Sequence, residues 1–213
     1  MKIAFDFDGT LVDSMPALRK SAVSFISEAY DKSYEQADVW YMSTIGRSFR
    51  EQIDFLFSGD KLNDEIARKF YDEHAKIYET VSLHFGVIET ITELNSREIP
   101  YGIVSSSSES LIESAVTRLL PEFTGSIYGI ESGTKREQLR AFNPSDFVGD
   151  TVYDCITSRR LGIRFTGVTH TFILNDVKRM GAPVADSIPS AVDLILNHNA
   201  APESISQEPR EAV

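Results

Sequence analysis

The stretch that decides the fold is MKIAFDFDGT, residues 1–10, in which an apolar run leads into Asp6 and Asp8 and then a Gly-Thr pair. A short apolar run that ends at glycine is typical of a buried strand followed by a turn. Because side chains alternate along a strand, Asp6 and Asp8 are expected to point the same way. Adjacent carboxylates repel each other, so they suit a divalent cation, an attacking carboxylate or an acid/base pair. The plain alternative is a turn in which the two aspartate side chains do no more than accept hydrogen bonds from nearby backbone N–H groups.

The sequence FVGDTVYD, residues 147–154, repeats this arrangement near the other end of the chain. An apolar strand leads into Asp150, and Asp154 follows one helical turn later if a helix begins near Thr151. Helix capping is the plain interpretation of these two aspartates. A second acidic strand end favours a shared Mg²⁺ site, because hard dications take carboxylate oxygens together with substrate phosphate.

The segment DFDGTLVDS, residues 6–14, resembles the first motif of the haloacid dehalogenase-like superfamily of phosphotransferases. Three further segments match in the order which that superfamily requires: an apolar strand ending in Ser105 and Ser106, then Lys135, then Gly149-Asp150 with Asp154. The resemblance therefore covers most of the chain. It implies a Mg²⁺ cofactor and a set of site residues: catalytic Asp6, Asp8, Ser105 and Lys135; substrate-binding Ser105 and Ser106; and metal-binding Asp6, Asp8, Asp150 and Asp154.

In this scheme Asp6 is the nucleophile that forms an aspartyl-phosphate, and Asp8 is the general acid and then the base. The Asp8 backbone carbonyl is also expected on the metal. Ser105 and Lys135 contact the phosphoryl group, and Asp154 binds the metal directly or through water. Outside the four motifs, the loop 43–47 offers Arg47 as a further candidate substrate-binding residue, for an anionic substrate, and an ordinary exposed arginine is the alternative interpretation.

Several positions leave alternatives open. Aspartate at both positions of the first motif argues against the dehalogenase and phosphonate-cleaving branches. Ser106 stands where asparagine is frequent, and Ser105 could simply cap the following helix. Lys135 lacks the usual Gly-Lys-Pro setting, so its neighbour Arg136 is a rival for the role. The four histidines show no metal-ligand spacing and are interpreted as structural or surface residues.

Apolar residues at helical spacing over residues 14–83 predict about four helices, and strands alternate with helices beyond residue 86. The predicted class is therefore α/β: a Rossmann-like parallel sheet with helices on both faces and a small all-helical cap inserted after the first strand. Residues 1–13 and 84–199 form the predicted core, residues 14–83 the cap and residues 200–213 a flexible tail. The predicted elements after the cap are helices 87–97, 109–120, 134–142, 152–161, one from about 176 and 189–197, and strands 101–105, 126–130, 146–148 and 164–168.

The charge and composition of the chain limit the kinds of molecule that it is expected to bind. The net charge of −11, from 32 acidic against 21 basic residues, argues against non-specific binding to nucleic acid or anionic membranes. The absence of an 18-residue apolar run argues against a membrane span, and the immediate start of the first strand leaves no room for a signal peptide. The single cysteine, Cys155, fits a reducing cytoplasm. The expected protein is a cytoplasmic monomer or homodimer.

The predicted function is a Mg²⁺-dependent phosphatase that acts on a small phosphorylated metabolite through an aspartyl-phosphate. Phosphoglycolate, a sugar phosphate and a nucleotide monophosphate all remain open as substrates. One alternative is a phosphomutase of the β-phosphoglucomutase type, which has the same residues. The other is a binding or regulatory member of the fold with little turnover.

Overall fold

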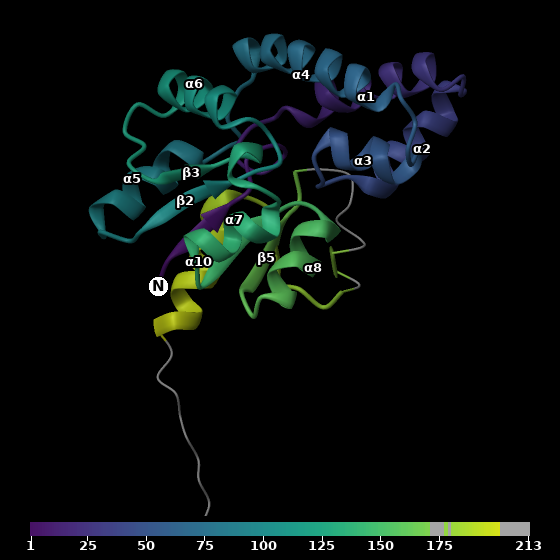
Figure 1. The fold of residues 1–213 in the computed structure, drawn as a ribbon. Coiled ribbons are helices and arrows are strands. Elements are labelled where there is room, and N and C mark those ends of the chain that lie inside the picture. Colours follow the sequence, from purple (N-terminus) through teal and green to yellow (C-terminus); the bar gives the residue numbers. More distant parts are fainter. Residues whose placement is uncertain (171–176, 179, 201–213) are drawn as a thin grey trace, which may run out of the picture.

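The apolar runs of the sequence form a parallel sheet at the centre of the computed structural model, which describes residues 1–170, 177, 178 and 180–200 (Figure 1). The six strands lie in the order β3-β2-β1-β4-β5-β6, and every neighbouring pair is parallel. Their bounds are β1 Ile3–Phe5, β2 Tyr101–Val104, β3 Ser126–Tyr128, β4 Asp146–Gly149, β5 Arg164–Val168 and β6 Val184–Ala185. The predicted α/β class is confirmed, although the sequence analysis did not predict β6.

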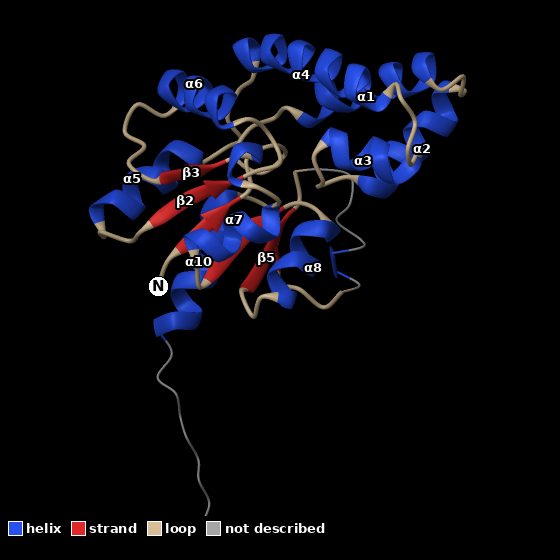
Figure 2. Ribbon diagram, in the orientation of Figure 1, coloured by secondary structure: helices blue, strands red, loops and turns tan. Residues whose placement is uncertain are grey.

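Alternation along the strands divides the core into two layers. In β1, Ile3 and Phe5 join the apolar cluster that includes α5, α6 and α10, whereas Ala4 joins the cluster that includes α7 and α8. The helices on the first face are α5 Val87–Ser96, α6 Glu109–Leu119 and α10 Ile188–Ala200; those on the second are α7 Lys135–Phe142 and α8 Val152–Arg160 (Figure 2). Helices therefore cover both faces of the sheet. In sheets of this kind, binding sites lie at the carboxyl ends of the strands.

Four helices between β1 and α5 cover that carboxyl edge, and we refer to them as the cap helices (Figure 1). They are α1 Met15–Ala29, α2 Tyr34–Thr44, α3 Phe49–Leu56 and α4 Asn63–Thr80. They share an apolar cluster of their own, built around side chains such as Leu18, Ile26 and Phe70. Capping boxes at Ser33 and Ser48 fix where α2 and α3 begin. The four predicted helices are thus present, while the division into two domains remains a prediction.

The two connections between the cap helices and the core lie side by side. The Asp13 N–H donates to the Ser82 carbonyl at 2.9 Å, and the His84 N–H donates to the Leu11 carbonyl at 3.0 Å. The C-terminal end of α4 is held by the core, because Arg118 of α6 donates to the Tyr78 carbonyl at 2.7 Å. The packing therefore changes from cap to core within the last turn of α4, just before the predicted boundary at residue 83.

One predicted strand is shorter than expected. Strand β3 ends at Tyr128, and a 3₁₀ turn, η1 Ile130–Ser132, replaces its predicted end. Gly129 leaves the sheet because its carbonyl accepts a hydrogen bond from Gln138 at 2.6 Å instead of from a neighbouring strand. The helix predicted from about Asp176 and the tail of residues 200–213 lie largely outside the described residues. Within the described part of the chain, no helix combines the length and the apolar composition that crossing a membrane requires.

Candidate active site

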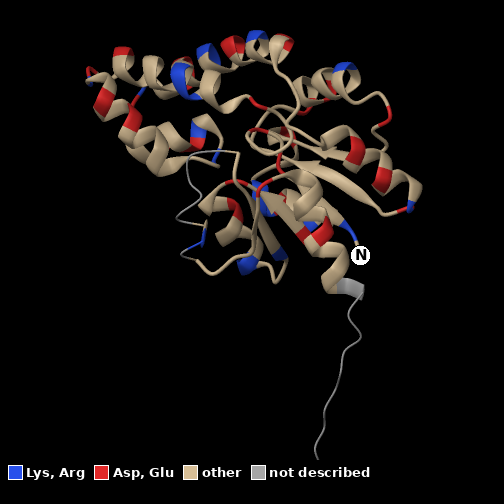
Figure 3. Ribbon diagram, turned by 180° about the vertical axis from the view of Figure 1, so that it is seen from behind, with Lys and Arg blue, Asp and Glu red and all other residues tan. Residues whose placement is uncertain are grey.

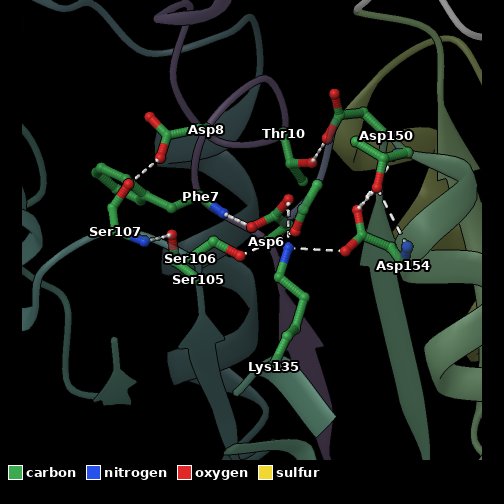
Figure 4. Close-up of polar contacts among 12 residues, drawn as sticks. Asp6, Phe7, Asp8, Thr10, Ser105, Ser106, Ser107, Lys135, Asp150 and Asp154 are labelled. Carbon is green, nitrogen blue, oxygen red and sulfur yellow. Dashed lines mark hydrogen bonds and ion pairs between the residues drawn. The ribbon is translucent and has the colours of Figure 1, made fainter. Parts of the chain in front are cut away.

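Three buried carboxylates meet at the carboxyl ends of β1 and β4 (Figure 4). Asp6 follows β1 directly, Asp150 follows β4, and Asp154 lies in the first turn of α8. Their exposed fractions are 4%, 1% and 0%, and one oxygen from each lies within 4.8 Å of the others. Carboxylate oxygens at this spacing are the donor set that a hard dication such as Mg²⁺ prefers. The structure thus brings together three of the four predicted metal ligands.

Lys135, the first residue of α7, lies between two of these carboxylates (Figure 4). Its Nζ is 2.7 Å from Asp154 Oδ1 and 3.1 Å from Asp6 Oδ2. Burial alone would lower the pKa of Lys135, but the charges of Asp154 and Asp6 together raise it above the ordinary value. The ammonium therefore stays charged. The rival Arg136 is exposed, so the structure places Lys135 and not its neighbour at the site.

The surroundings of Asp6 disfavour the ionised form of its carboxyl group. Burial raises the pKa of Asp6, Lys135 opposes this rise, and Asp154 and Asp150 add to it. One carboxylate oxygen accepts a hydrogen bond from the Phe7 N–H at 2.8 Å. Burial and the neighbouring carboxylates thus disfavour the ionised form of Asp6, and a dication bound beside it would favour that form.

Two threonines hold the other carboxylates in place. Thr10 Oγ1 donates to Asp150 Oδ1 at 3.0 Å. Thr151 forms the N-terminal capping box of α8, donating from Oγ1 to Asp154 Oδ2 at 2.6 Å, which leaves Asp154 Oδ1 for Lys135. Asp154 therefore caps the helix and belongs to the site at once. The sequence analysis missed both threonines, although the spacing of Thr151 and Asp154 is that of a capping box.

Asp8 lies on the other side of Asp6, away from Asp150 and Asp154 (Figure 4). Its carboxylate accepts hydrogen bonds from three hydroxyl groups: Ser14 at 2.6 Å, Tyr78 at 2.7 and 2.8 Å to its two oxygens, and Ser107 at 2.6 Å. The structure does not bring this carboxylate into the three-aspartate cluster. A metal contact through its backbone carbonyl and its acid/base role remain predictions. Tyr78 of α4 had no sequence signal, because its contact with Asp8 spans 70 residues.

The predicted phosphate-binding serines lie beside this group. Ser105 Oγ accepts a hydrogen bond from the Ser107 N–H at 3.1 Å and is 1% exposed. Ser106 Oγ donates to the carbonyl of Gly46, in the loop between α2 and α3, at 2.9 Å. Next to Gly46, the Arg47 guanidinium lies 5.1 Å from the ring of Phe55 and 5.3 Å from that of Tyr153. The contacts of Ser106 thus join the cap loop to the core.

A cavity of about 60 Å³ lies between these core residues and the cap helices. Its core wall includes Asp6, Asp8, Ser105, Ser106 and Lys135, and its cap wall includes Leu18, Tyr41, Arg47, Phe49, Phe70 and His74. At about 10–15 Å³ for each water centre, the space holds roughly four to six water molecules. His74 and Tyr41 were not predicted as site residues, because a lone histidine and an aromatic residue at helical spacing are indistinguishable from core in a sequence.

Charge is distributed differently outside and inside the site. Acidic side chains occur along the cap helices and along the core helices (Figure 3), in keeping with the net charge of −11. A phosphorylated molecule is therefore not attracted by the protein as a whole. Inside the cavity, by contrast, the basic side chains Lys135 and Arg47 are part of the lining.

Comparison with known proteins agrees with this arrangement. The family model of haloacid dehalogenase-like hydrolases matches residues 3–168. Phosphoglycolate phosphatase of Synechococcus elongatus is 29% identical over 202 residues, which cover 86% of this chain and 90% of that protein. Phosphoglycolate phosphatase 1 of Pseudomonas aeruginosa is 21% identical, over 89% of this chain and 75% of that protein.

Solved structures share the fold. A predicted phosphatase from Clostridium acetobutylicum superposes with a TM-score of 0.73 at 20% identity, covering 92% of this chain and 98% of the other. CbbY from Rhodobacter sphaeroides, solved in complex with phosphate, gives 0.70 at 16% identity, covering 87% and 93%. The family model spans all four motifs, from Asp6 to Asp154, that meet at the carboxyl edge of the sheet. The chain therefore belongs to the haloacid dehalogenase-like hydrolase family and is similar to its phosphoglycolate phosphatases.

Proposed function

We propose that the protein is a Mg²⁺-dependent phosphatase that hydrolyses a small phosphomonoester through an aspartyl-phosphate on Asp6. The observation that carries the proposal is the position of Asp6, which lies at the floor of the cavity, 3.1 Å from a buried lysine and within 4.8 Å of Asp150 and Asp154. A carboxylate held beside a cation and a metal-binding cluster suits attack on phosphorus.

The three-aspartate cluster fits Mg²⁺, because it offers three buried carboxylate oxygens within 4.8 Å of one another. Asp6, Asp150 and Asp154 would hold the ion, and Asp8 would contribute its backbone carbonyl. When bound, Mg²⁺ neutralises charge on the oxygens of the phosphoryl group. It also favours the ionised form of Asp6, whose pKa is otherwise raised by burial.

In the proposed reaction an Asp6 carboxylate oxygen attacks phosphorus, and the bond between phosphorus and the ester oxygen breaks. Asp8 gives a proton to the departing oxygen and then removes one from a water molecule that attacks the aspartyl-phosphate. This step releases phosphate and restores Asp6. To do so, Asp8 exchanges one of its present hydroxyl partners, such as Tyr78 of α4, for the substrate oxygen. Lys135 and Ser105 stabilise the phosphoryl oxygens.

The size of the cavity and the curated relatives indicate the first substrate to test. A space of about 60 Å³ suits a phosphoryl group with a leaving group of few atoms. The relatives from Synechococcus elongatus and Pseudomonas aeruginosa are phosphoglycolate phosphatases. We therefore propose 2-phosphoglycolate as the first candidate, with Ser106 and Arg47 contacting the bound ester. The expected cytoplasmic location and the monomeric or homodimeric state remain predictions.

Release of inorganic phosphate from a panel of small phosphomonoesters tests the proposal. Activity should require Mg²⁺, disappear in excess chelator and return when Mg²⁺ is restored. Asp6→Asn keeps the side-chain shape and removes the nucleophilic charge, so turnover should fall by at least about 10³-fold. Asp72→Asn, an equivalent change at an exposed position of α4, is the control and should retain wild-type activity. Full activity in chelator, or a tenth of the wild-type rate in a normally folded Asp6→Asn protein, would contradict the proposal.

A further inference from the structure

His74 of α4 is a buried polar residue that has no hydrogen-bond partner among the residues the structure describes. Its side chain is 3% exposed, and neither ring nitrogen has a hydrogen bond within the described ranges of the chain. Buried nitrogens are nearly always paired in folded proteins, so this pair requires a specific explanation. The ring centroid lies 4.6 Å from that of Tyr78 and 5.4 Å from that of Phe70. These contacts fix the ring without satisfying either nitrogen.

The location of His74 supplies the explanation. Ser21, His84 and Gln138 also carry a buried side-chain atom that has no hydrogen bond to the described residues, but none of them belongs to the wall of the active-site cavity. His74 is part of that wall, on the cap side, whereas Asp6 and Lys135 form the core side. Because the cavity measures only about 60 Å³, a small molecule that fills it contacts both walls. A substrate that fills the cavity displaces the water it holds and lies beside His74, where it can supply the hydrogen-bond partner that the described residues do not.

The protonation state limits what this group is. Burial lowers the pKa of His74, and the charge of Asp8 opposes the change only in part, so the ring is neutral near pH 7. A neutral imidazole offers one N–H donor and one acceptor nitrogen. An oxygen on the leaving group satisfies the donor, whereas a plain hydrocarbon leaves it unpaired at a cost in binding.

We propose that His74 is a specificity-determining residue whose ring N–H donates to a hydroxyl or carboxylate oxygen on the leaving group of the substrate. The inference rests on the proposed phosphatase function and names its substrate class. The substrates are small phosphomonoesters with an oxygen group within about three carbons of the ester. The phosphoryl group lies at Asp6, and the oxygen group faces α4.

Three two-carbon esters test this inference, because they differ only at the end that would face His74. They are 2-phosphoglycolate with a carboxylate, 2-hydroxyethyl phosphate with a hydroxyl and ethyl phosphate with a methyl group. The wild-type enzyme should show at least a tenfold higher kcat/KM for one of the two oxygen-bearing esters than for ethyl phosphate. His74→Leu should reduce this preference to threefold or less. His198→Leu makes the same change at an exposed position of α10 and should leave the preference intact.

A binding measurement tests the role of His74 in a protein that does not turn over the ester. Calorimetry with Mg²⁺ in the Asp6→Asn background should show at least a tenfold weaker affinity for the preferred ester when His74→Leu is added. A preference that persists in His74→Leu, an equal loss for all three esters, or unchanged affinity would overturn the role of His74. If no ester is hydrolysed by the wild-type protein, the proposed phosphatase function fails. The calorimetric comparison then still decides the role of His74, and an absence of detectable binding counts against it.

Discussion

Lys135→Met tests the electrostatic arrangement on which the site depends. Methionine keeps the length and the apolar stem of the lysine side chain and removes only the ammonium group. In the wild-type protein that group lies 2.7 Å from Asp154 and 3.1 Å from Asp6, and all three side chains are at most 6% exposed. Removing one partner of a buried ion pair lowers the free energy of unfolding by about 3–5 kcal/mol. In a domain of this size that corresponds to a fall of roughly 6–20 °C in Tm.

The size of this effect should depend on pH. Burial already raises the pKa of Asp6 above 3.8, and loss of Lys135 removes the main effect that opposes the rise. When the pKa of an acid is higher in the native state than in the unfolded state, its protonated form stabilises the native state. This stabilisation is fully present below the pKa of the unfolded state and is lost as the pH rises through the pKa of the native state. Lys135 itself stays charged throughout this range, because its pKa is raised above 10.5. The stability difference between wild type and Lys135→Met should therefore be smaller at pH 5 than at pH 8.

Urea unfolding followed by circular dichroism, in chelator at pH 5 and at pH 8, measures this difference. Lys76→Met is the matched control, because it breaks an ion pair to Glu73 of 3.0 Å on an exposed face of α4. Such surface pairs contribute about 0.5 kcal/mol or less. Addition of Mg²⁺ should raise the Tm of Lys135→Met more than that of the wild type. A Lys135→Met protein that unfolds within about 1 kcal/mol of the wild type at pH 8 would refute the reasoning.

Two further predictions concern the cap loop and the metal. Gly46→Ala should lower kcat/KM at least tenfold, because Gly46 has a φ of +95° and an added Cβ would lie 2.6 Å from Thr151 Oγ1. Gly59→Ala is the control, because Gly59 has a φ of +77° and no atom lies within 4 Å of the added Cβ. It has in common with Gly46→Ala only the backbone strain of about 1–2 kcal/mol. Equal kcat/KM in the two variants would contradict the argument. Asp150→Asn should raise the Mg²⁺ concentration for half-maximal activity at least tenfold, and an unchanged metal titration would show that Asp150 is not a ligand.

The sequence alone predicted the α/β class with its parallel sheet and the approach of Asp6, Asp150 and Asp154 to one another. Asp6 and Asp150 each follow an apolar strand, and the carboxyl ends of neighbouring parallel strands meet at one edge of the sheet. Local rules of alternation and helix spacing therefore placed both carboxylates together before any tertiary contact was known. The same reasoning placed Asp154 one helical turn beyond Asp150, on the face toward the site.

Contacts that depend on how α4 crosses the core were not accessible in this way. The hydroxyl group of Tyr78 reaches Asp8 from a sequence distance of 70 residues, and no local pattern encodes its approach. His74 shows the same limit, because a histidine among apolar residues at helical spacing reads as an ordinary core position. Local sequence determined which residues follow the strands, since backbone geometry is set by near neighbours. Only the packing of the cap helices on the sheet decided which side chains enclose the cavity, because that depends on contacts between distant parts of the chain.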